Sequence, residues 1–143
     1  VNARQTCFRG ADLEGAKLAG LRGLRANFSD ARLVGADLTQ AILEDAELGG
    51  IQAKKAIFRG AQMGSARLTG AHLEGAVFQS ANLTWADLSH ADLRATNLED
   101  AVLDFANLHR ADMAQARMSG ASMLGVRKTS LDRSAAEDFS TKA

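Results

Sequence analysis

Asp87, His90 and His109 are the residues of this chain whose types and proximity could hold a metal ion. A metal site needs ligands that converge in a concavity. On the fold inferred below, His90 and His109 come to one side, close to Asp87, but on a convex surface. We therefore interpret them as solvated surface histidines and expect no metal site.

Catalytic chemistry needs a nucleophile beside a base, held in a pocket. The sequence places no such pair together, and its Ser and Thr residues fall at turn and strand positions of the pattern described next. We expect no catalytic residues, no cofactor and no enzyme activity.

Large apolar residues recur at every fifth position from Phe8 to Met123, and we call these positions the centres. Of the 24 centres, 22 are Leu, Phe or Met, the exceptions being Gly23 and Ala53, and 20 of the 24 residues two places earlier are Ala. A period of five matches neither the 3.6 of a helix nor the 2 of a strand. It predicts a solenoid in which the centre and the alanine point inward while the other three residues face water.

The corners and the number of sides also follow from spacing. Ten of the 13 glycines lie two places after a centre, where a tight turn needs a permissive backbone. Like residues tend to stack in neighbouring coils, and three aromatic pairs are 20 residues apart: Phe8 and Phe28, Phe58 and Phe78, Trp85 and Phe105. This spacing predicts four pentapeptides per coil and about six coils of 20 residues.

Two departures from the pattern keep the five-residue register. Leu21 precedes Gly23 and Ile51 precedes Ala53, so a larger residue stands before each small centre. Such exchanges conserve core volume and are well tolerated. We therefore expect both segments to form ordinary sides of the coil.

The repeats also resemble a known family. Segments such as Ala36-Asp37-Leu38-Thr39-Gln40, Ala81-Asn82-Leu83-Thr84-Trp85 and Ala86-Asp87-Leu88-Ser89-His90 match the A-[DN]-L-x-x pattern of pentapeptide repeat proteins. The resemblance implies an all-β fold, a right-handed quadrilateral β-helix. It also implies a binding or scaffold role, which most members of the family have. One branch resembles DNA and protects type II topoisomerases from quinolones. No enzyme activity is implied.

The pattern divides the chain into a repeat domain, 1–125, and a C-terminal tail, 126–143. An open end of a solenoid exposes strand edges and needs a cap. Leu131, Ala135 and Phe139 have helical spacing, and Ser134 and Glu137 have the spacing of a capping box. We expect a short helix between about Ser130 and Lys142 that caps the last coil; in the topoisomerase-protecting branch this end forms a homodimer, and a disordered tail is the remaining alternative.

Composition narrows the partners and the compartment. The chain has 17 basic and 17 acidic residues and a formal net charge of zero, which gives no general attraction to nucleic acid or to an anionic membrane. A single cysteine, Cys7, forms no internal disulfide and fits a reducing compartment. There is no apolar run typical of a signal peptide or a membrane span. We expect a cytoplasmic location, although the chain begins at Val1 without Met, as a processed or excised protein would.

Apolar residues at outward positions are the feature that the repeat does not explain. The side of the solenoid that carries Leu83 and Leu103 also displays Trp85, Val102, Phe105 and Leu124. A stacked aromatic pair flanked by Val and Leu is typical of a protein interface. We predict that these four residues bind a protein partner of unknown identity; the alternative is that the tail folds back and covers them through Leu131 and Phe139.

Charge bears on the second candidate function, protection of DNA gyrase by DNA mimicry with resulting quinolone resistance. A mimic of DNA must present negative charge along its whole length. Here an acidic region around Asp87, Asp92 and Asp104 is balanced by basic residues around Lys54 and Lys55. The sequence therefore favours a rigid protein-binding scaffold, with topoisomerase protection as the alternative.

Overall fold

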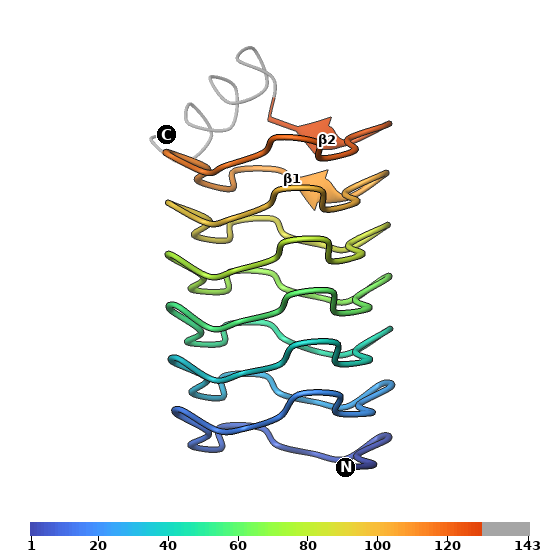
Figure 1. Ribbon diagram of the computed structural model, residues 1–143, viewed down its shortest axis with the longest axis vertical. Helices are drawn as coiled ribbons and strands as arrows, with labels where there is room; N and C mark the ends of the chain where they lie inside the picture. Colours follow the sequence, from blue (N-terminus) through green and yellow to red (C-terminus); the bar gives the residue numbers. More distant parts are fainter. Residues whose placement is uncertain (130–143) are drawn as a thin grey trace, which may run out of the picture.

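The computed structural model describes residues 1–129 as a stack of flat coils that rise along one axis from the N-terminus (Figure 1). Every bridge is parallel and joins residues 20 apart, from Asn2 and Arg22 at one end to Val102 and Ser122 near the other. The ladder widens into two short strands, β1 (Asn107–Leu108) and β2 (Arg127–Lys128), which also pair in parallel. A pairing distance of 20 residues agrees with four pentapeptides per coil, so we number 20-residue coils from residue 1 and call 61–80 coil 4, 81–100 coil 5 and 101–120 coil 6.

The backbone N–H groups of a pentapeptide with Asn or Asp before its centre are all paired, as 81–85 shows. In 81–85, Ala81 donates to the carbonyl of Phe78 within the turn, Asn82 donates to Ala61 in the previous coil, and Leu83 and Trp85 donate to Val102 and Asp104 in the next. The remaining N–H, that of Thr84, donates to the side-chain oxygen of Asn82 at 3.0 Å. Buried or half-buried backbone groups must be paired, so where an Asp or Asn precedes the centre, as at nine of the 24 centres, its side chain completes the hydrogen bonding.

The core is a column of large side chains surrounded by alanines. In the middle of the rod the centres and the alanines two places before them are fully buried. Phe8 stacks on Phe28 with ring centroids 4.8 Å apart, and Phe58 on Phe78 at 4.9 Å, as the 20-residue spacing predicts. Leu21 and Ile51 are buried beside their small centres, so both segments form ordinary sides of the coil.

The corners have one backbone conformation throughout. All residues two places after a centre, from Gln5 to Gly125, have φ between 54° and 74°, and 15 of them are not glycine. This left-handed region is unfavourable for residues with a Cβ. The coil geometry therefore imposes the turn on whichever residue occupies the corner, and glycine is favoured there without being required.

The two ends of the described rod are less covered than its middle. Phe8, Leu13 and Leu18 in the first coil, and Met113, Met118 and Met123 near the other end, are only partly buried. The pairing of β1 with β2 continues the ladder to Lys128. The helix expected between Ser130 and Lys142, and with it the proposed cap or dimer contact, lies outside the described residues. Within 1–129 no helix is long and apolar enough to cross a membrane.

Candidate functional site

An exposed aromatic pair lies at one corner of coils 5 and 6. Trp85 and Phe105 occupy equivalent corner positions, and their rings stack with centroids 4.7 Å apart and an interplanar angle of 16°. Trp85 is 59% exposed and Phe105 is 36% exposed. The stack is the outer counterpart of the phenylalanine stacks of the core, because the coil spacing places equivalent side chains at ring-stacking distance.

Gly125 makes room for the second ring of the stack. A Cβ built on Gly125 would lie 2.6 Å from Cδ1 of Phe105, so the ring leans over the glycine toward the next coil. The neighbouring Leu124 is 66% exposed and accepts the backbone N–H of Phe105 through its carbonyl at 2.7 Å. The structure therefore brings Leu124 directly beside the aromatic pair.

Val102 completes the group on the same side of the rod. It lies in coil 6, pairs with Asn82 in coil 5 on one side and with Ser122 in the coil after coil 6 on the other, and is half-buried. The structure thus gathers the four residues that the sequence predicted, Trp85, Val102, Phe105 and Leu124, on one side, and we call them the aromatic surface.

The area around the aromatic surface contains almost no charge. From coil 4 onward, the outward positions of this side are Gln62, Gly64, Ser65, Asn82, Thr84, Trp85, Val102, Asp104, Phe105, Ser122, Leu124 and Gly125. Asp104 is the one ionisable residue among them. Its carboxylate accepts the Ser122 hydroxyl at 2.5 Å and the Leu124 backbone N–H at 3.0 Å, so it fixes the turn that carries Leu124. Depletion of charge around aromatic residues is typical of the core of a protein interface.

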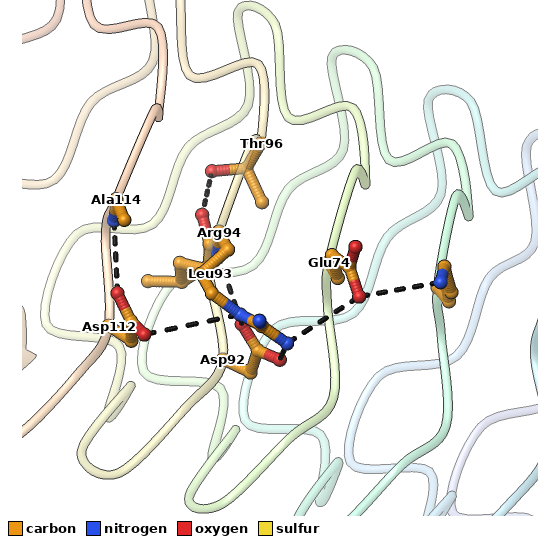
Figure 2. Close-up of polar contacts among 8 residues, drawn as sticks. Glu74, Asp92, Leu93, Arg94, Thr96, Asp112 and Ala114 are labelled. Atoms are coloured by element: carbon orange, nitrogen blue, oxygen red, sulfur yellow. Dashed lines mark hydrogen bonds and ion pairs between the residues drawn. The ribbon is translucent and has the colours of Figure 1, made fainter.

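Elsewhere on the described rod, charged side chains form ladders of alternating sign. Glu74 lies between Lys54 at 3.4 Å and Arg94 at 3.5 Å, and Arg94 also contacts Asp92 at 2.7 Å and Asp112 at 4.0 Å (Figure 2). The hydrogen bond from Arg94 lowers the pKa of Asp92, and Asp92 in turn raises the pKa of Arg94. Exposed pairs of this kind stabilise weakly, so these ladders define a solvated face.

The two histidines lie close together without forming a metal centre. The rings of His90 and His109 meet edge to face with centroids 5.7 Å apart, and Nδ1 of His109 lies 3.1 Å from the Thr129 hydroxyl. Asp87 accepts hydrogen bonds from Ser89 and Asn107. Within residues 1–129 no group of three or more His, Cys, Asp or Glu side chains could hold a metal ion.

Sequence reasoning missed two residues that support the aromatic surface. The need for Gly125 beneath Phe105 could have been read from the 20-residue register, which places the two at the same corner of adjacent coils. The hydrogen bonds of Asp104 could not have been predicted from the sequence, because the types of Asn82 and Ser122 give no signal that the carboxylate reaches toward the next coil. Cys7 is exposed and lies far along the chain from this surface.

Solved structures of several proteins resemble this chain. The pentapeptide repeat protein HetL of the cyanobacterium Nostoc, involved in the regulation of heterocyst differentiation, is 32% identical over 87% of this chain and 65% of its own, with a TM-score of 0.36. A pentapeptide repeat protein of the Arabidopsis thaliana thylakoid lumen is 28% identical over 73% of this chain and 72% of its own, with a TM-score of 0.32. Full-length QnrB1, a plasmid-mediated fluoroquinolone resistance protein, is 19% identical over 93% of this chain and 84% of its own, with a TM-score of 0.34.

These likenesses leave the function of the chain open. The chain spans less than two thirds of the length of HetL. No curated protein matches the sequence. The family and its fold rest on the repeats themselves.

The model of the pentapeptide repeats matches residues 6–45, 56–94 and 86–125, in eight copies. Proteins with these repeats form right-handed quadrilateral β-helices, in agreement with the parallel pairing of residues 20 apart. Their characterised members are generally non-enzymatic scaffolds. The matched segments cover well over half of the sequence, and the chain belongs to the pentapeptide repeat family.

Proposed function

We propose that this protein is a non-catalytic scaffold that presents a rigid surface to a protein partner, with Trp85 and Phe105 as anchors and Val102 and Leu124 beside them. One observation carries the proposal: of the four large apolar side chains exposed in residues 1–129, three belong to this surface, and the fourth is Val1. Clustered exposed apolar residues mark interaction sites, and tryptophan is enriched among the residues that dominate binding energy.

The side chains at the two anchors, rather than their backbone, support a role in binding. Trp85 and Phe105 have φ of 61° and 60°, and the other corner residues with a Cβ have similar values, so the conformation is common to the corners. What distinguishes these two corners is a large aromatic ring that does not fill the core. Exposed aromatic side chains of this kind are better explained by a contact with a partner than by stability.

Rigidity is the mechanism by which this surface would bind. Each coil is hydrogen bonded to its neighbours along all four sides, so the anchors are held in place before the partner arrives. A preordered surface loses little conformational entropy on association. The proposed role therefore needs no conformational change and no reaction.

The distribution of charge favours this proposal over protection of a topoisomerase by DNA mimicry. Mimicry needs continuous negative charge. On the described rod, carboxylates are interleaved with cations, as where Arg32 contacts Asp12 at 3.2 Å and Glu14 at 2.8 Å, or where Arg67 contacts Glu47 at 3.3 Å. The same balance speaks against nucleic acid as the partner.

The test is a pull-down from a lysate of the source organism with the wild-type protein and a Trp85→Asp, Phe105→Asp variant, at low and moderate salt. A Ser80→Asp, Ala95→Asp variant is the matched control, because both residues are exposed corner residues with φ of 59° and 56° on other corners of the rod. The control adds the same two charges without touching the aromatic surface. Circular dichroism of all three proteins checks that each is folded.

We expect a partner that is retained at moderate salt by the wild type and the control and is lost in the aromatic variant. Apolar contacts tolerate salt, whereas contacts between exposed charges weaken as salt screens them. Recovery of gyrase or topoisomerase IV at low salt only, equally by all three proteins, would contradict the proposal and support mimicry. A variant that loses stability without losing a partner would instead indicate that the tail covers the aromatic pair.

A further inference from the structure

The corner that carries the aromatic pair changes its chemistry along the rod. Its successive residues, 20 apart, are Arg25, Asp45, Ser65, Trp85, Phe105 and Gly125, and we call them the corner column. One face of the Trp85 ring is covered by Phe105 at 4.7 Å. On the side away from Phe105, the equivalent corner residue of coil 4 is Ser65, which is too small to cover an indole, and Trp85 is 59% exposed. The aromatic stack therefore ends at Trp85 with a ring face open toward coil 4.

In coil 4 the two outward residues at this corner are small, Gly64 and Ser65, and we call this pair of small residues the step. A Cβ built on Gly64 would meet only the Thr84 carbonyl oxygen, at 3.8 Å, and Ser65 is exposed. Beyond them, in the preceding coil, stand two exposed carboxylates, Glu44 and Asp45. The open face of Trp85 in coil 5 and the acidic pair in coil 3 are thus two coils apart, and only the small residues of coil 4 lie between them.

The acidic pair is only half neutralised within the described part of the chain. Asp45 forms an exposed ion pair with Arg25 at 3.9 Å, whereas Glu44 forms no ion pair there. Glu47, the next carboxylate along the chain, is already paired with Arg67 at 3.3 Å. A net negative charge therefore remains beside the step at Ser65, next to a ring whose face attracts cations.

We propose that the step at Gly64 and Ser65 receives an arginine side chain of the protein partner, stacked on Trp85 and paired with Glu44 and Asp45. A cation lies within about 6 Å of a ring centroid in a cation–π contact, and an ion pair joins atoms within about 4 Å. Two coil steps of ~4.8 Å accommodate both.

Arginine fits this site better than the other occupants of such a ring face. A partner's aromatic side chain would also stack on Trp85, but the carboxylates beyond it offer such a ring nothing. Lysine would satisfy the charges, but arginine is planar, so it stacks on an indole and forks toward carboxylates at the same time. The inference rests on the proposed function, since it names the side chain that the partner would bring to the aromatic surface.

The test begins with a random peptide library displayed on phage and selected on the full-length protein, with counter-selection on Trp85→Ala. We expect the peptides that require Trp85 to be enriched in arginine. A selected peptide without tryptophan is then titrated while the fluorescence of Trp85 is followed, which is specific because the chain has a single tryptophan.

The selected peptide is compared with a version in which citrulline, neutral but of the same shape, replaces the arginine. The two contacts together predict at least a tenfold loss of affinity for the citrulline peptide. The Glu44→Gln, Asp45→Asn variant should lose a similar factor for the arginine peptide and little for the citrulline peptide. This non-additivity isolates the contact between the arginine and the acidic pair.

Filling the step gives a second, independent variant. Ser65→Phe extends the aromatic stack at a corner with φ of 57°, much as Phe105 already does at 60°, and should abolish binding of the arginine peptide. Ser80→Phe makes the same change at a corner with φ of 59° on another side and should leave binding unchanged.

The outcomes separate this inference from the function on which it rests. Peptides that require Trp85 but carry no arginine, or that bind equally well with citrulline, would overturn the arginine site while leaving the aromatic surface as a protein-binding site. Failure to select any peptide that requires Trp85 or Phe105 would overturn both.

Discussion

At the scale of single residues, the corners combine an unfavourable backbone conformation with the side chains that we assign to binding. Each corner residue is forced into the left-handed region, and at Trp85 and Phe105 a bulky side chain adopts it. The stacking of the two rings at 4.7 Å stabilises the protein by about 0.5–1.5 kcal/mol and offsets part of the unfavourable free energy of the left-handed backbone. The stack keeps both rings in one orientation, so it fixes the shape of the surface that we assign to a partner.

Gly125→Ala should disturb this stack. The new Cβ would lie 2.6 Å from Cδ1 of Phe105 and would sit on a backbone with φ of 63°, so both the ring and the turn must adjust. We expect a loss of about 1–2 kcal/mol from the turn together with a change in Trp85 fluorescence, measured by urea unfolding and emission spectra.

Gly70→Ala is the control for that change. Gly70 has φ of 65°, and a Cβ built there would meet nothing within 4 Å, so the variant reports the cost of the turn alone. An identical Trp85 spectrum in the two variants would contradict the packing of Phe105 over Gly125.

The sequence could predict which residues meet at the corner but not their conformation. Glycine dominates the corner position, which indicates a turn, whereas nothing in the types Trp85 and Phe105 indicates a left-handed backbone. The register carries that information, because every residue two places after a centre must turn with the coil. The closure of the solenoid coil therefore outweighs the preference of residues with a Cβ for negative φ.

At the scale of the pentapeptide, an Asp or Asn before the centre, where present, completes the hydrogen bonding. Thr39 donates both its hydroxyl, at 2.6 Å, and its backbone N–H, at 3.0 Å, to the carboxylate of Asp37. These hydrogen bonds lower the pKa of Asp37 from its ordinary value of 3.8. A carboxyl whose pKa is lower in the folded state stabilises the fold above its unfolded pKa, and the stabilisation is lost as pH falls through the folded pKa.

Thr39→Val should therefore destabilise the protein at neutral pH and lose that effect in acid. Removing the hydroxyl bond raises the pKa of Asp37 toward 3.8, so the difference from the wild type is largest above pH 4 and shrinks below it. Urea unfolding between pH 7 and pH 2, with an NMR titration of Asp37, measures both quantities.

Thr84→Val provides a control that does not titrate. The Thr84 hydroxyl donates to Oδ1 of Asn82 at 2.6 Å, the same geometry with a neutral acceptor. Its cost should be independent of pH over this range. Equal pH dependence in the two variants would rule out the carboxylate of Asp37 as the source.

The sequence indicated a preference for Asp or Asn before the centre through the A-[DN]-L pattern, but not the reason for it. The reason appears only when each N–H is followed to its acceptor: the ladder and the turn supply four acceptors, and the side chain supplies the fifth.

At the scale of the whole molecule, the rod is stabilised by contacts between adjacent coils. Because each coil packs only on its neighbours, the stability of a solenoid is approximately a sum of neighbouring contacts. The core aromatic pairs span such contacts, as where Phe58 meets Phe78 at 4.9 Å with nearly parallel rings. A defect in one coil therefore weakens two interfaces.

Phe78→Ala should be among the most damaging single changes. The side chain is fully buried in coil 4, and its removal loses the stack on Phe58 and leaves a cavity, at a cost of about 3–5 kcal/mol. Val77→Ala, at the adjacent outward position, should cost less than about 1 kcal/mol. Chemical denaturation of both variants measures the difference, and similar losses in the two would contradict the inward orientation of the centres.

The period of five was sufficient to predict the axis of the rod, the stacked pairs and the place of the aromatic surface. It could not reveal the Gly64 and Ser65 step as a feature, because small residues at outward positions look ordinary until the charges of Glu44 and Asp45 and the open ring of Trp85 lie around them. Binding sites on a repeat protein arise where outward residues differ from the repeat pattern, and the role of such a residue depends on the residues 20 positions away in the adjacent coils.

The central claim is that the aromatic surface contacts a protein partner, and site-specific photo-crosslinking in the source organism tests it most directly. Benzoylphenylalanine placed at Phe105 should yield a discrete adduct with another protein on irradiation, while the same residue at Ser80, an exposed corner residue on another side, should not. Adducts from the Ser80 position alone, or a product from Phe105 that joins only the chain's own C-terminal residues, would contradict the account.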